Sequence, residues 1–339
     1  MEHTTESMAW LGRNDGTVTV GHGPFTESAA APQEGTAFYI QDFALRSPTP
    51  WKIPARVETI PIQTFHDRFD SAAPAHFEWQ PMDAAPFSVV FQEIMAAIRS
   101  GIFEKTVPVV IEHGHSPMYA GETILSAMTG QHAPLHSYGW TNGHSGFAGA
   151  TPEVLFSLEG NHLKTMALAG TARAEDRDVF EVDEKEIREH EYVAQTLVSK
   201  LLDFGQLYRH AREILDLGQI VHFLTLIDVE LTGQHSPEEL IRRLHPTPAL
   251  GPLPRTDVTL GMLLKWRESL GCPAHFGAPF GLWNHGTFDA VVAIRGMWWD
   301  ERYVHLPAGC GIIEASRLVN EWRELRLKRD AVKSFLLKR

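Results

Sequence analysis

The stretch LPAGCGIIEASRLVNEWRELRLKRDAV, residues 306–332, predicts a strand, a glycine turn and then a long helix. On that helix Glu321, Glu324 and Lys328 are separated by three and four residues, so their side chains share one face. Apolar residues elsewhere on the helix can fix it to a core, namely Trp322, Leu325, Val332 and Phe335. Two carboxylates on one face repel each other unless a cation lies between them. The face is therefore either a solvated surface with internal ion pairs or half of a cation site.

A second stretch, VDEKEIREHEYVAQTLVSKLL at residues 182–202, predicts another helix. Its Glu186 and Glu189 are three residues apart, and His190 follows them. Two such E-x-x-E faces on separate helices could together hold one hard divalent cation. Ligation by carboxylates alone suits Mg²⁺, which keeps some of its waters and leaves positions for an anionic substrate. The spacing of the glutamates is the basis of this Mg²⁺-site hypothesis.

The composition sets limits on the class of protein. The chain of 339 residues is 43% hydrophobic and 21% charged, an ordinary globular mixture that can bury a large core. A formal net charge of -12 disfavours a nucleic-acid partner, because phosphate binding requires a basic surface. Cys272 and Cys310 lack metal-ligand spacing and suggest no disulfide framework, which favours a reducing, cytoplasmic setting. We see no signal-peptide pattern and no apolar run of roughly 18 residues, so we expect a soluble protein without membrane contact.

The chain divides by composition at about residue 85. Residues 1–85 alternate short strand-like pieces with loop-rich segments and predict accessory strands and loops packed on the same domain. In this part His66 and His76 are predicted to be surface or packing residues. Residues 86–339 predict the catalytic domain. Its expected strands lie at residues 103–112, 163–171, 218–231 and 289–299, and residues 149–157 predict a turn containing Glu153 followed by a strand. Its expected helices lie at residues 87–99, 182–202, 236–244, 259–270 and after the glycine turn.

Some positions in this domain admit both a structural and a functional interpretation. Lys105 begins a buried strand, so it is either a snorkelling edge residue or a desolvated amine of the kind that a general base needs. Gly170 and Thr171 end a strand where the chain either turns or lets a ligand approach the backbone. Arg295 lies among apolar neighbours, and a buried guanidinium requires an anion, so it is half of an ion pair or a carboxylate clamp.

Ten short motifs occur along the chain in this order: KTVPVV, GATPEVL, LAGTA, DEKEIREH, VHFLT, LHPTPALG, FGAPFG, VAIR, AGCGII and EWRELRLK. Together they resemble the chorismate-utilising enzymes, which include the anthranilate, aminodeoxychorismate, isochorismate and salicylate synthases. The resemblance covers roughly residues 87–336. It implies an α+β fold with four α/β/β/α layers and orthogonally packed antiparallel sheets.

The resemblance also implies roles for individual residues. Glu189 and Glu324 match the two Mg²⁺ ligands of the family, with Glu186 and Glu321 as their companions. The metal would hold the ring carboxylate of chorismate, and Arg295 would clamp the enolpyruvyl carboxylate. The positions that the resemblance places against the substrate are Gly170, Thr171, His222, Ala249, Leu250, Phe276, Arg295, Gly309, Gly311 and Lys328.

The nucleophile distinguishes the branches of this family. Lys105 matches the lysine that activates water for attack at ring C2, and Glu153 matches the acid that protonates the departing C4 hydroxyl. Enzymes that add ammonia lack this lysine and depend on a glutamine amidotransferase subunit, which we therefore do not expect. Ala169 stands where aminodeoxychorismate synthases often carry a covalent lysine, which argues against that activity.

We therefore expect a Mg²⁺-dependent isochorismate synthase acting in menaquinone or siderophore biosynthesis, as a monomer or homodimer. The first alternative is a salicylate synthase, which also eliminates pyruvate. Ala249 and Leu250 look like the isochorismate type, whereas salicylate synthases tend to place a hydroxyl residue at position 249. His222 is shared by both types, and Phe276 occupies a position that is often Tyr. The second alternative is a chorismate-binding protein without turnover, against which the presence of both proposed catalytic residues argues.

Overall fold

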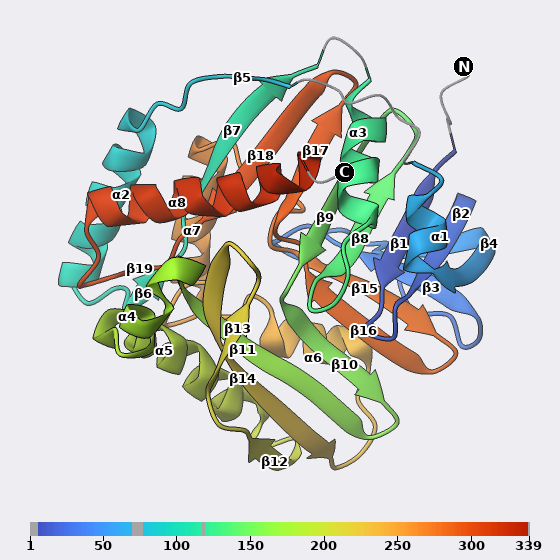
Figure 1. Ribbon diagram of the computed structural model, residues 1–339. Coiled ribbons are helices and arrows are strands. Elements are labelled where there is room, and N and C mark those ends of the chain that lie inside the picture. The colour runs from blue at the N-terminus through green and yellow to red at the C-terminus, as the bar shows by residue number, and fades with distance from the viewer. Residues whose placement is uncertain (1–5, 70–76, 117–118, 338–339) are drawn as a thin grey trace.

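The computed structural model describes residues 6–69, 77–116 and 119–337. In this part of the chain seventeen strands form one continuous antiparallel sheet (Figure 1). From one edge the strands run in the order β5 (Glu78–Trp79), β7 (Val109–His115), β18 (Tyr303–Gly309), β17 (Gly296–Asp300), β9 (Ser145–Thr151), β8 (His136–Thr141), β1 (Met8–Gly12), β2 (Thr17–Ser28), β4 (Trp51–Pro61), β3 (Thr36–Ile40), β15 (Pro279–Asn284), β16 (Thr287–Val292), β10 (Val154–Glu159), β11 (His162–Arg173) and β14 (Ile220–Leu231). The last of these also pairs with β12 (Gly205–Arg209) and β13 (Glu213–Asp216).

The sheet folds over so that its two ends pack face to face. We call the strands from β5 to β8 in this order the first half, and the strands from β15 to β14 the second half. Apolar side chains from both halves form the core between them, among them Val109, Ile111, Phe147, Trp298, Phe280, Leu282 and Val291. This alternation of inward apolar residues is what antiparallel strands require when one face is buried.

Helices cover the two outer faces of the folded sheet. The first half is covered by α2 (Ala85–Arg99), α3 (Ala120–Thr129) and α8 (Leu318–Lys333), and the second by α5 (Glu184–Leu201) and α6 (Pro237–Leu244) (Figure 1). Helix α7 (Asp257–Ser269) contributes Leu263 to one of these outer cores and Trp266 to the other. The short helices are α1 (Ile62–His66) and α4 (Arg177–Glu181), with 3-10 turns at Ala174–Asp176 and Ser334–Leu336. The predicted four-layer α/β/β/α fold is confirmed.

The first eighty-five residues supply strands that join the two halves. Strand β1 pairs with β8 of the first half, and β3 pairs with β15 of the second. Trp10 and Trp51 from this segment are fully buried. The predicted packing of His66 agrees with its ring contact to the Thr129 hydroxyl, 3.3 Å away. His76 lies outside the described residues, and the division of the chain at residue 85 stays a prediction.

Two predicted strands are wrong as continuous elements. The strand expected at residues 103–112 divides into β6 (Lys105–Thr106), which pairs with β19 (Ile312–Ile313), and β7, since Pro108 has no N–H for a ladder. The strand expected at residues 289–299 divides into β16 and β17. Arg295 lies between them with a φ of 55°, a left-handed conformation that a strand does not contain.

The two helices that carry the glutamates occur where their spacing predicts them. Helix α5 begins at Glu184, because the Asp183 side chain caps it by accepting from the backbone N–H groups of Lys185 and Glu186. Helix α8 follows β18 and a turn, as the C-terminal stretch predicts. Across the described ranges, no helix combines the length and the apolar character that crossing a membrane requires.

Candidate active site

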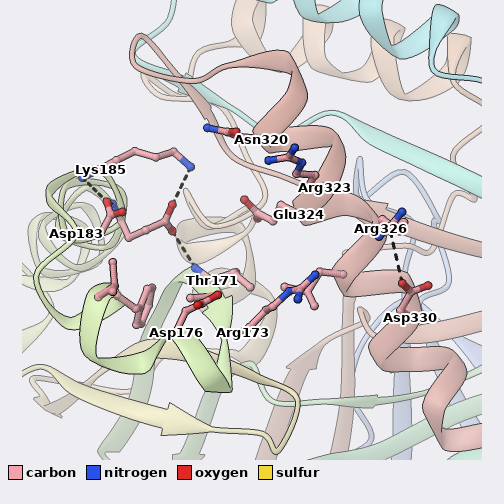
Figure 2. A pocket seen from close by; sticks show the side chains of 15 residues that line it. Thr171, Arg173, Asp176, Asp183, Lys185, Asn320, Arg323, Glu324, Arg326 and Asp330 are labelled. Atoms are coloured by element: carbon pink, nitrogen blue, oxygen red, sulfur yellow. Dashed lines mark hydrogen bonds and ion pairs between the residues drawn. The ribbon is translucent and has the colours of Figure 1, made fainter.

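The predicted site residues come together between α5, α8 and the ends of the central strands. An inner cavity of about 70 Å³ is lined by most of them: Glu153, Gly170, Thr171, Glu189, His222, Ala249, Leu250, Phe276, Arg295, Gly309, Gly311 and Lys328. An outer cavity of about 640 Å³ shares Thr171 with the inner one and is lined by Glu186 and Glu324. Figure 2 shows Thr171 and Glu324 in this lining. The remaining two line neither cavity but contact residues that do: Lys105 contacts Glu189, and Glu321 contacts Lys185. The residues predicted from the sequence therefore lie in one contiguous region.

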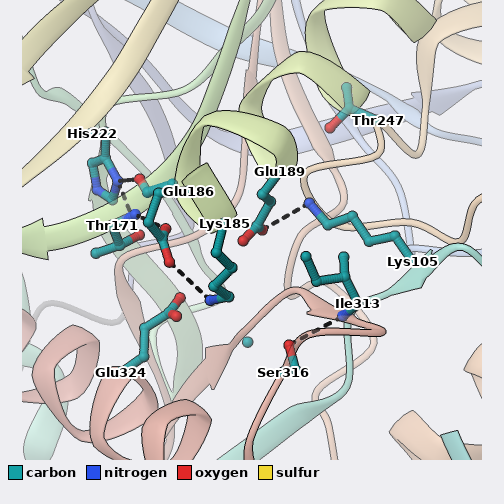
Figure 3. A network of polar contacts seen from close by, with 12 residues as sticks. Lys105, Thr171, Lys185, Glu186, Glu189, His222, Thr247, Ile313, Ser316 and Glu324 are labelled. Atoms are coloured by element: carbon teal, nitrogen blue, oxygen red, sulfur yellow. Dashed lines mark hydrogen bonds and ion pairs between the residues drawn. The ribbon is translucent and has the colours of Figure 1, made fainter. Parts of the chain in front are cut away.

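The four glutamates lie on two facing helices, Glu186 and Glu189 on α5 and Glu321 and Glu324 on α8. Each of them has a lysine close by. Lys185 Nζ lies 2.8 Å from Glu186 Oε1 and 3.4 Å from Glu321 Oε1. The other two pairs are Lys105 with Glu189 at 2.8 Å and Lys328 with Glu324 at 2.6 Å. Figure 3 shows the contacts of Lys185 and Lys105.

Backbone groups complete the surroundings of these ion pairs. The Glu186 carboxylate accepts a hydrogen bond from the Thr171 N–H at 2.9 Å, and Lys328 donates to the Gly309 carbonyl at 3.0 Å. At Gly311 an added Cβ would lie 2.1 Å from Glu189 Oε1 and 2.8 Å from Lys105 Cε. A side chain at this position would therefore separate the buried pair, which explains a glycine in the turn before α8.

The closeness of the carboxylates changes their ionisation. Burial, and next the charge of Glu324, raises the pKa of Glu321 to about 8. Burial and the charge of Glu189 raise the pKa of Glu186 to about 6. Burial also opposes ionisation of Glu189, but the ammonium groups of Lys105 and Lys185 outweigh it, so the pKa of Glu189 is lowered. The cluster is short of positive charge even with three lysines beside it.

The donor set of this cluster fits a hard divalent cation. It consists of carboxylates on two rigid helices, and oxygen ligands of this kind suit Mg²⁺. Within the described ranges, however, no three His, Cys, Asp or Glu side chains stand close enough together to bind a metal ion. The glutamates are instead spread around ammonium groups. The site thus has the right chemistry for a cation, and side-chain rearrangement would have to bring the ligands together.

Arg295 points into the inner cavity from the break between β16 and β17. It donates a hydrogen bond from Nη2 to His222 Nε2 at 2.9 Å. Burial lowers the pKa of Arg295 to about 10. Among the residues whose placement is described, no carboxylate lies within 4.0 Å of its guanidinium. The structural ion pair is therefore not the arrangement observed, and the guanidinium is available to an anion.

His222 orients this guanidinium. Since its Nε2 accepts from Arg295, the proton of the neutral ring lies on Nδ1, which donates to the Gly170 carbonyl at 2.7 Å. Burial and the positive charge of Arg295 lower the pKa of His222 well below its usual value. Gly170 can present its carbonyl in this way because it has a φ of 77°. His222, predicted to bind substrate, lines the cavity but has both ring nitrogens engaged with protein groups.

Glu153 lies directly before β10 and lines the inner cavity. It is 4% exposed, and burial raises its pKa to about 7. The Thr247 hydroxyl donates to Glu153 Oε1 at 3.3 Å. A carboxyl in this state keeps a proton in a substantial fraction of molecules at neutral pH, as a general acid requires.

Sequence reasoning missed two residues of this site. Thr247 belongs to the motif LHPTPALG, and Lys185 belongs to DEKEIREH. The sequence predicted the nearby site residues Ala249 and Glu186, but not the contacts of Thr247 with Glu153 and of Lys185 with the glutamates. A hydroxyl between two prolines and a lysine directly beside Glu186 were the available signals.

One known family matches most of the chain. The sequence model of the chorismate binding enzyme family matches residues 56–337, which include both glutamate pairs and the residues lining the inner cavity. The chain belongs to this family, so the predicted resemblance is confirmed.

Individual relatives within this family are named as isochorismate synthases. Isochorismate synthase MenF of Haemophilus influenzae is 28% identical over 215 residues, which is 60% of this chain and 49% of that protein. The salicylate biosynthesis isochorismate synthase of Pseudomonas aeruginosa is 28% identical over 255 residues, 72% of this chain and 53% of that protein. Isochorismate synthase EntC of Escherichia coli K12 is 30% identical over 194 residues, 53% and 48% of the two chains. The aligned stretches thus span about half the length of these relatives.

Solved structures show the shared fold over nearly the whole chain. MenF, the menaquinone-specific isochorismate synthase from Escherichia coli, superposes with a TM-score of 0.84 at 18% identity, covering 99% of this chain and 90% of that one. DhbC from Bacillus anthracis, described as a putative 2,3-dihydroxybenzoate-specific isochorismate synthase, gives a TM-score of 0.81 at 18% identity, covering 99% and 97%.

Proposed function

We propose that this protein is a Mg²⁺-dependent isochorismate synthase that converts chorismate to isochorismate. The observation that carries the proposal is the presence, in one cavity, of a buried Glu153 with a pKa of about 7 and of Arg295, which pairs with none of the described carboxylates. Chorismate brings what each of them lacks: a hydroxyl to protonate and a carboxylate to bind. The curated relatives named above are isochorismate synthases, which supports the same activity.

Binding would rest on charge complementarity to a dianion. Arg295, held by His222, would take the enolpyruvyl carboxylate. Lys328 and the turn containing Gly309 and Gly311 would lie beside the ring carboxylate. Mg²⁺ bound by Glu189 and Glu324, with Glu186 and Glu321 as companions, would supply electrostatic attraction for that carboxylate.

The chemistry would then need one base and one acid. Lys105 would accept a proton from the water that attacks ring C2, and Glu153 would donate a proton to the hydroxyl that leaves C4 as water. The ring double bonds shift between these carbons, so the elemental composition of the substrate is unchanged. In the structure Lys105 pairs with Glu189, so this pair has to open before Lys105 can act.

We predict that Lys105→Gln lowers kcat by about 10²–10⁴-fold, because the variant lacks the base. It should still bind chorismate in the presence of Mg²⁺, as isothermal titration calorimetry can measure, since the glutamine amide can still donate to Glu189. Lys265→Gln, which changes an exposed lysine of α7, is the matched control. Wild-type turnover by the Lys105 variant would refute the base assignment.

The product identifies the branch. The purified protein is incubated with chorismate and Mg²⁺, and the products are separated by chromatography. We expect isochorismate without pyruvate, and loss of activity on addition of EDTA. Salicylate with stoichiometric pyruvate would make the protein a salicylate synthase, despite Ala249. Binding without product would favour a chorismate-binding protein, and product formation in EDTA would refute the metal dependence.

The cellular context follows from the same proposal. We expect activity without a glutamine amidotransferase subunit, because water replaces ammonia as the nucleophile. Isochorismate from this reaction would feed menaquinone or siderophore biosynthesis. The cytoplasmic location and the monomeric or homodimeric state remain predictions.

A further inference from the structure

Lys185 occupies an unusual place, in the middle of the four glutamates. Its Nζ contacts one carboxylate from each helix, Glu186 on α5 at 2.8 Å and Glu321 on α8 at 3.4 Å. Figure 3 shows the contact with Glu186. The side chain of Glu321 is 1% exposed and that of Lys185 is 25% exposed. The ammonium group therefore bridges two helices from opposite outer layers of the fold.

The surrounding charges explain why the lysine lies there. Burial disfavours its charge, but Glu189, Glu321, Glu186 and Glu324 together outweigh burial and raise the pKa of Lys185. Without a central cation, four carboxylates on facing helices would repel one another in a poorly solvated site. The lysine reduces this repulsion with a charge that the chain itself carries.

Glu186 and Glu321 are the companions of Glu189 and Glu324 in the proposed Mg²⁺ site, so the ammonium group of Lys185 and a divalent cation would compete for one glutamate cluster. We propose that Lys185 is a built-in counterion that fills the glutamate cluster in the metal-free protein and is displaced when Mg²⁺ binds, so that it sets the metal affinity. This inference rests on the metal site of the proposed function. It also accounts for the absence, among the described residues, of three metal-binding side chains in mutual reach, because the ammonium group lies between the carboxylates.

The structure also provides a place for the displaced side chain. Lys185 lines the outer cavity of about 640 Å³, together with the acidic residues Asp176 and Asp183 (Figure 2). Asp176 is exposed, and Asp183 lies two residues from Lys185 at the N-terminus of α5. Rotation of the side chain into this cavity would exchange buried carboxylate partners for solvated ones without moving the backbone.

The test compares Mg²⁺ binding by wild type and variants, using MgCl₂ alone in isothermal titration calorimetry. Lys185→Met keeps the length of the side chain and removes its charge. We expect its Kd for Mg²⁺ to fall by about tenfold or more, because the metal no longer competes with an ion pair. We expect Lys185→Arg, which keeps a cation, and the exposed Lys265→Met to stay within about threefold of wild type. An unchanged or higher Kd for Lys185→Met would overturn the inference.

A second measurement uses the wild-type protein, in case Lys185→Met folds poorly. Reductive methylation of lysines is followed by peptide mass spectrometry with and without MgCl₂. Release of Lys185 into the outer cavity should increase its labelling rate on addition of Mg²⁺, while Lys265 stays constant as internal reference. A labelling rate at Lys185 that is unchanged or lower with Mg²⁺ would overturn the inference. If wild type binds no Mg²⁺ in calorimetry, the metal site of the proposed function fails first, which is a distinguishable result.

Discussion

Glu153 is the residue at which burial has the clearest consequence for chemistry. Its carboxyl has a pKa near 4.5 in an unfolded chain and about 7 in the folded protein, chiefly because of burial. The hydrogen bond from Thr247 works in the opposite direction and is the smaller influence. The same burial that makes the group a suitable acid therefore makes it costly to ionise at high pH.

This difference predicts a pH-dependent stability. Between pH 4.5 and about 7 the folded state binds more protons at Glu153 than the unfolded state, so its contribution is full below 4.5 and is lost as the pH rises through 7. Glu153→Gln has no proton to lose. Its free energy of unfolding relative to wild type should rise by up to about 3 kcal/mol between pH 5 and pH 8 in urea titrations.

The same variant should lose turnover, since a glutamine cannot donate the proton that the C4 hydroxyl needs. Glu159→Gln, at an exposed position of β10, is the matched control for both measurements. A stability difference between Glu153→Gln and wild type that is constant from pH 5 to pH 8 would contradict the assignment of a raised pKa to this group.

At the scale of elements, the turn between β18 and β19 has room for no side chain at Gly311. A Cβ at Gly311 would lie 2.1 Å from Glu189 Oε1, in the middle of the ion pair with Lys105. Gly261 offers a comparison, because nothing lies within 4 Å of the Cβ that a substitution would add to it in α7.

We predict opposite outcomes for these two glycines. Gly311→Ala should lower the free energy of unfolding by about 1–3 kcal/mol and reduce Mg²⁺ affinity, because the buried pair has to move. Gly261→Ala should raise it by roughly 0.5–1 kcal/mol, since alanine suits a helix better than glycine. Thermal and urea unfolding measure both, and equal effects of the two substitutions would contradict the close packing at Gly311.

Elements also show how far the sequence could predict the structure. The spacing within each pair, Glu186 with Glu189 and Glu321 with Glu324, predicted two helical faces. This prediction is possible because residues three apart in sequence lie on one face of any α-helix. The break at Arg295, where φ is 55°, was not predicted, because the sequence around it continues the apolar pattern of a strand. Side-chain partners were not predicted either. Which cation each glutamate meets depends on tertiary packing that no local pattern encodes.

At the scale of the whole molecule, the N-terminal strands complete the sheet. Trp10 on β1 is fully buried and donates from Nε1 to the Ser137 hydroxyl of β8 at 3.0 Å. Strands β1 to β4 link the first half to the second by hydrogen bonds. The composition of the chain changes near residue 85, but strands on both sides of this position pair in one sheet. Strand pairing depends on backbone hydrogen bonds and not on the polarity of the connecting loops.

We therefore predict that the protein unfolds in one cooperative transition. Trp10→Ala should cost about 3–5 kcal/mol through lost burial and the cavity left behind, and should shift that single transition as a whole. Calorimetry and near-UV circular dichroism should report the same midpoint, with the exposed Tyr303→Ala as control. A separate early transition in the Trp10 variant would instead show that residues 1–85 unfold on their own.

The two glutamate pairs belong to opposite outer layers of the fold, and α8 follows all the strands of the sheet in chain order. During synthesis on the ribosome, Glu321 and Glu324 can therefore meet Glu186 and Glu189 only after both halves of the sheet have emerged. A nascent chain without α8 carries only the Glu186 and Glu189 pair, and a full-length chain with unpacked halves does not bring the two pairs together. If the proposed function holds, turnover reports completed folding, because the site needs both glutamate pairs in contact.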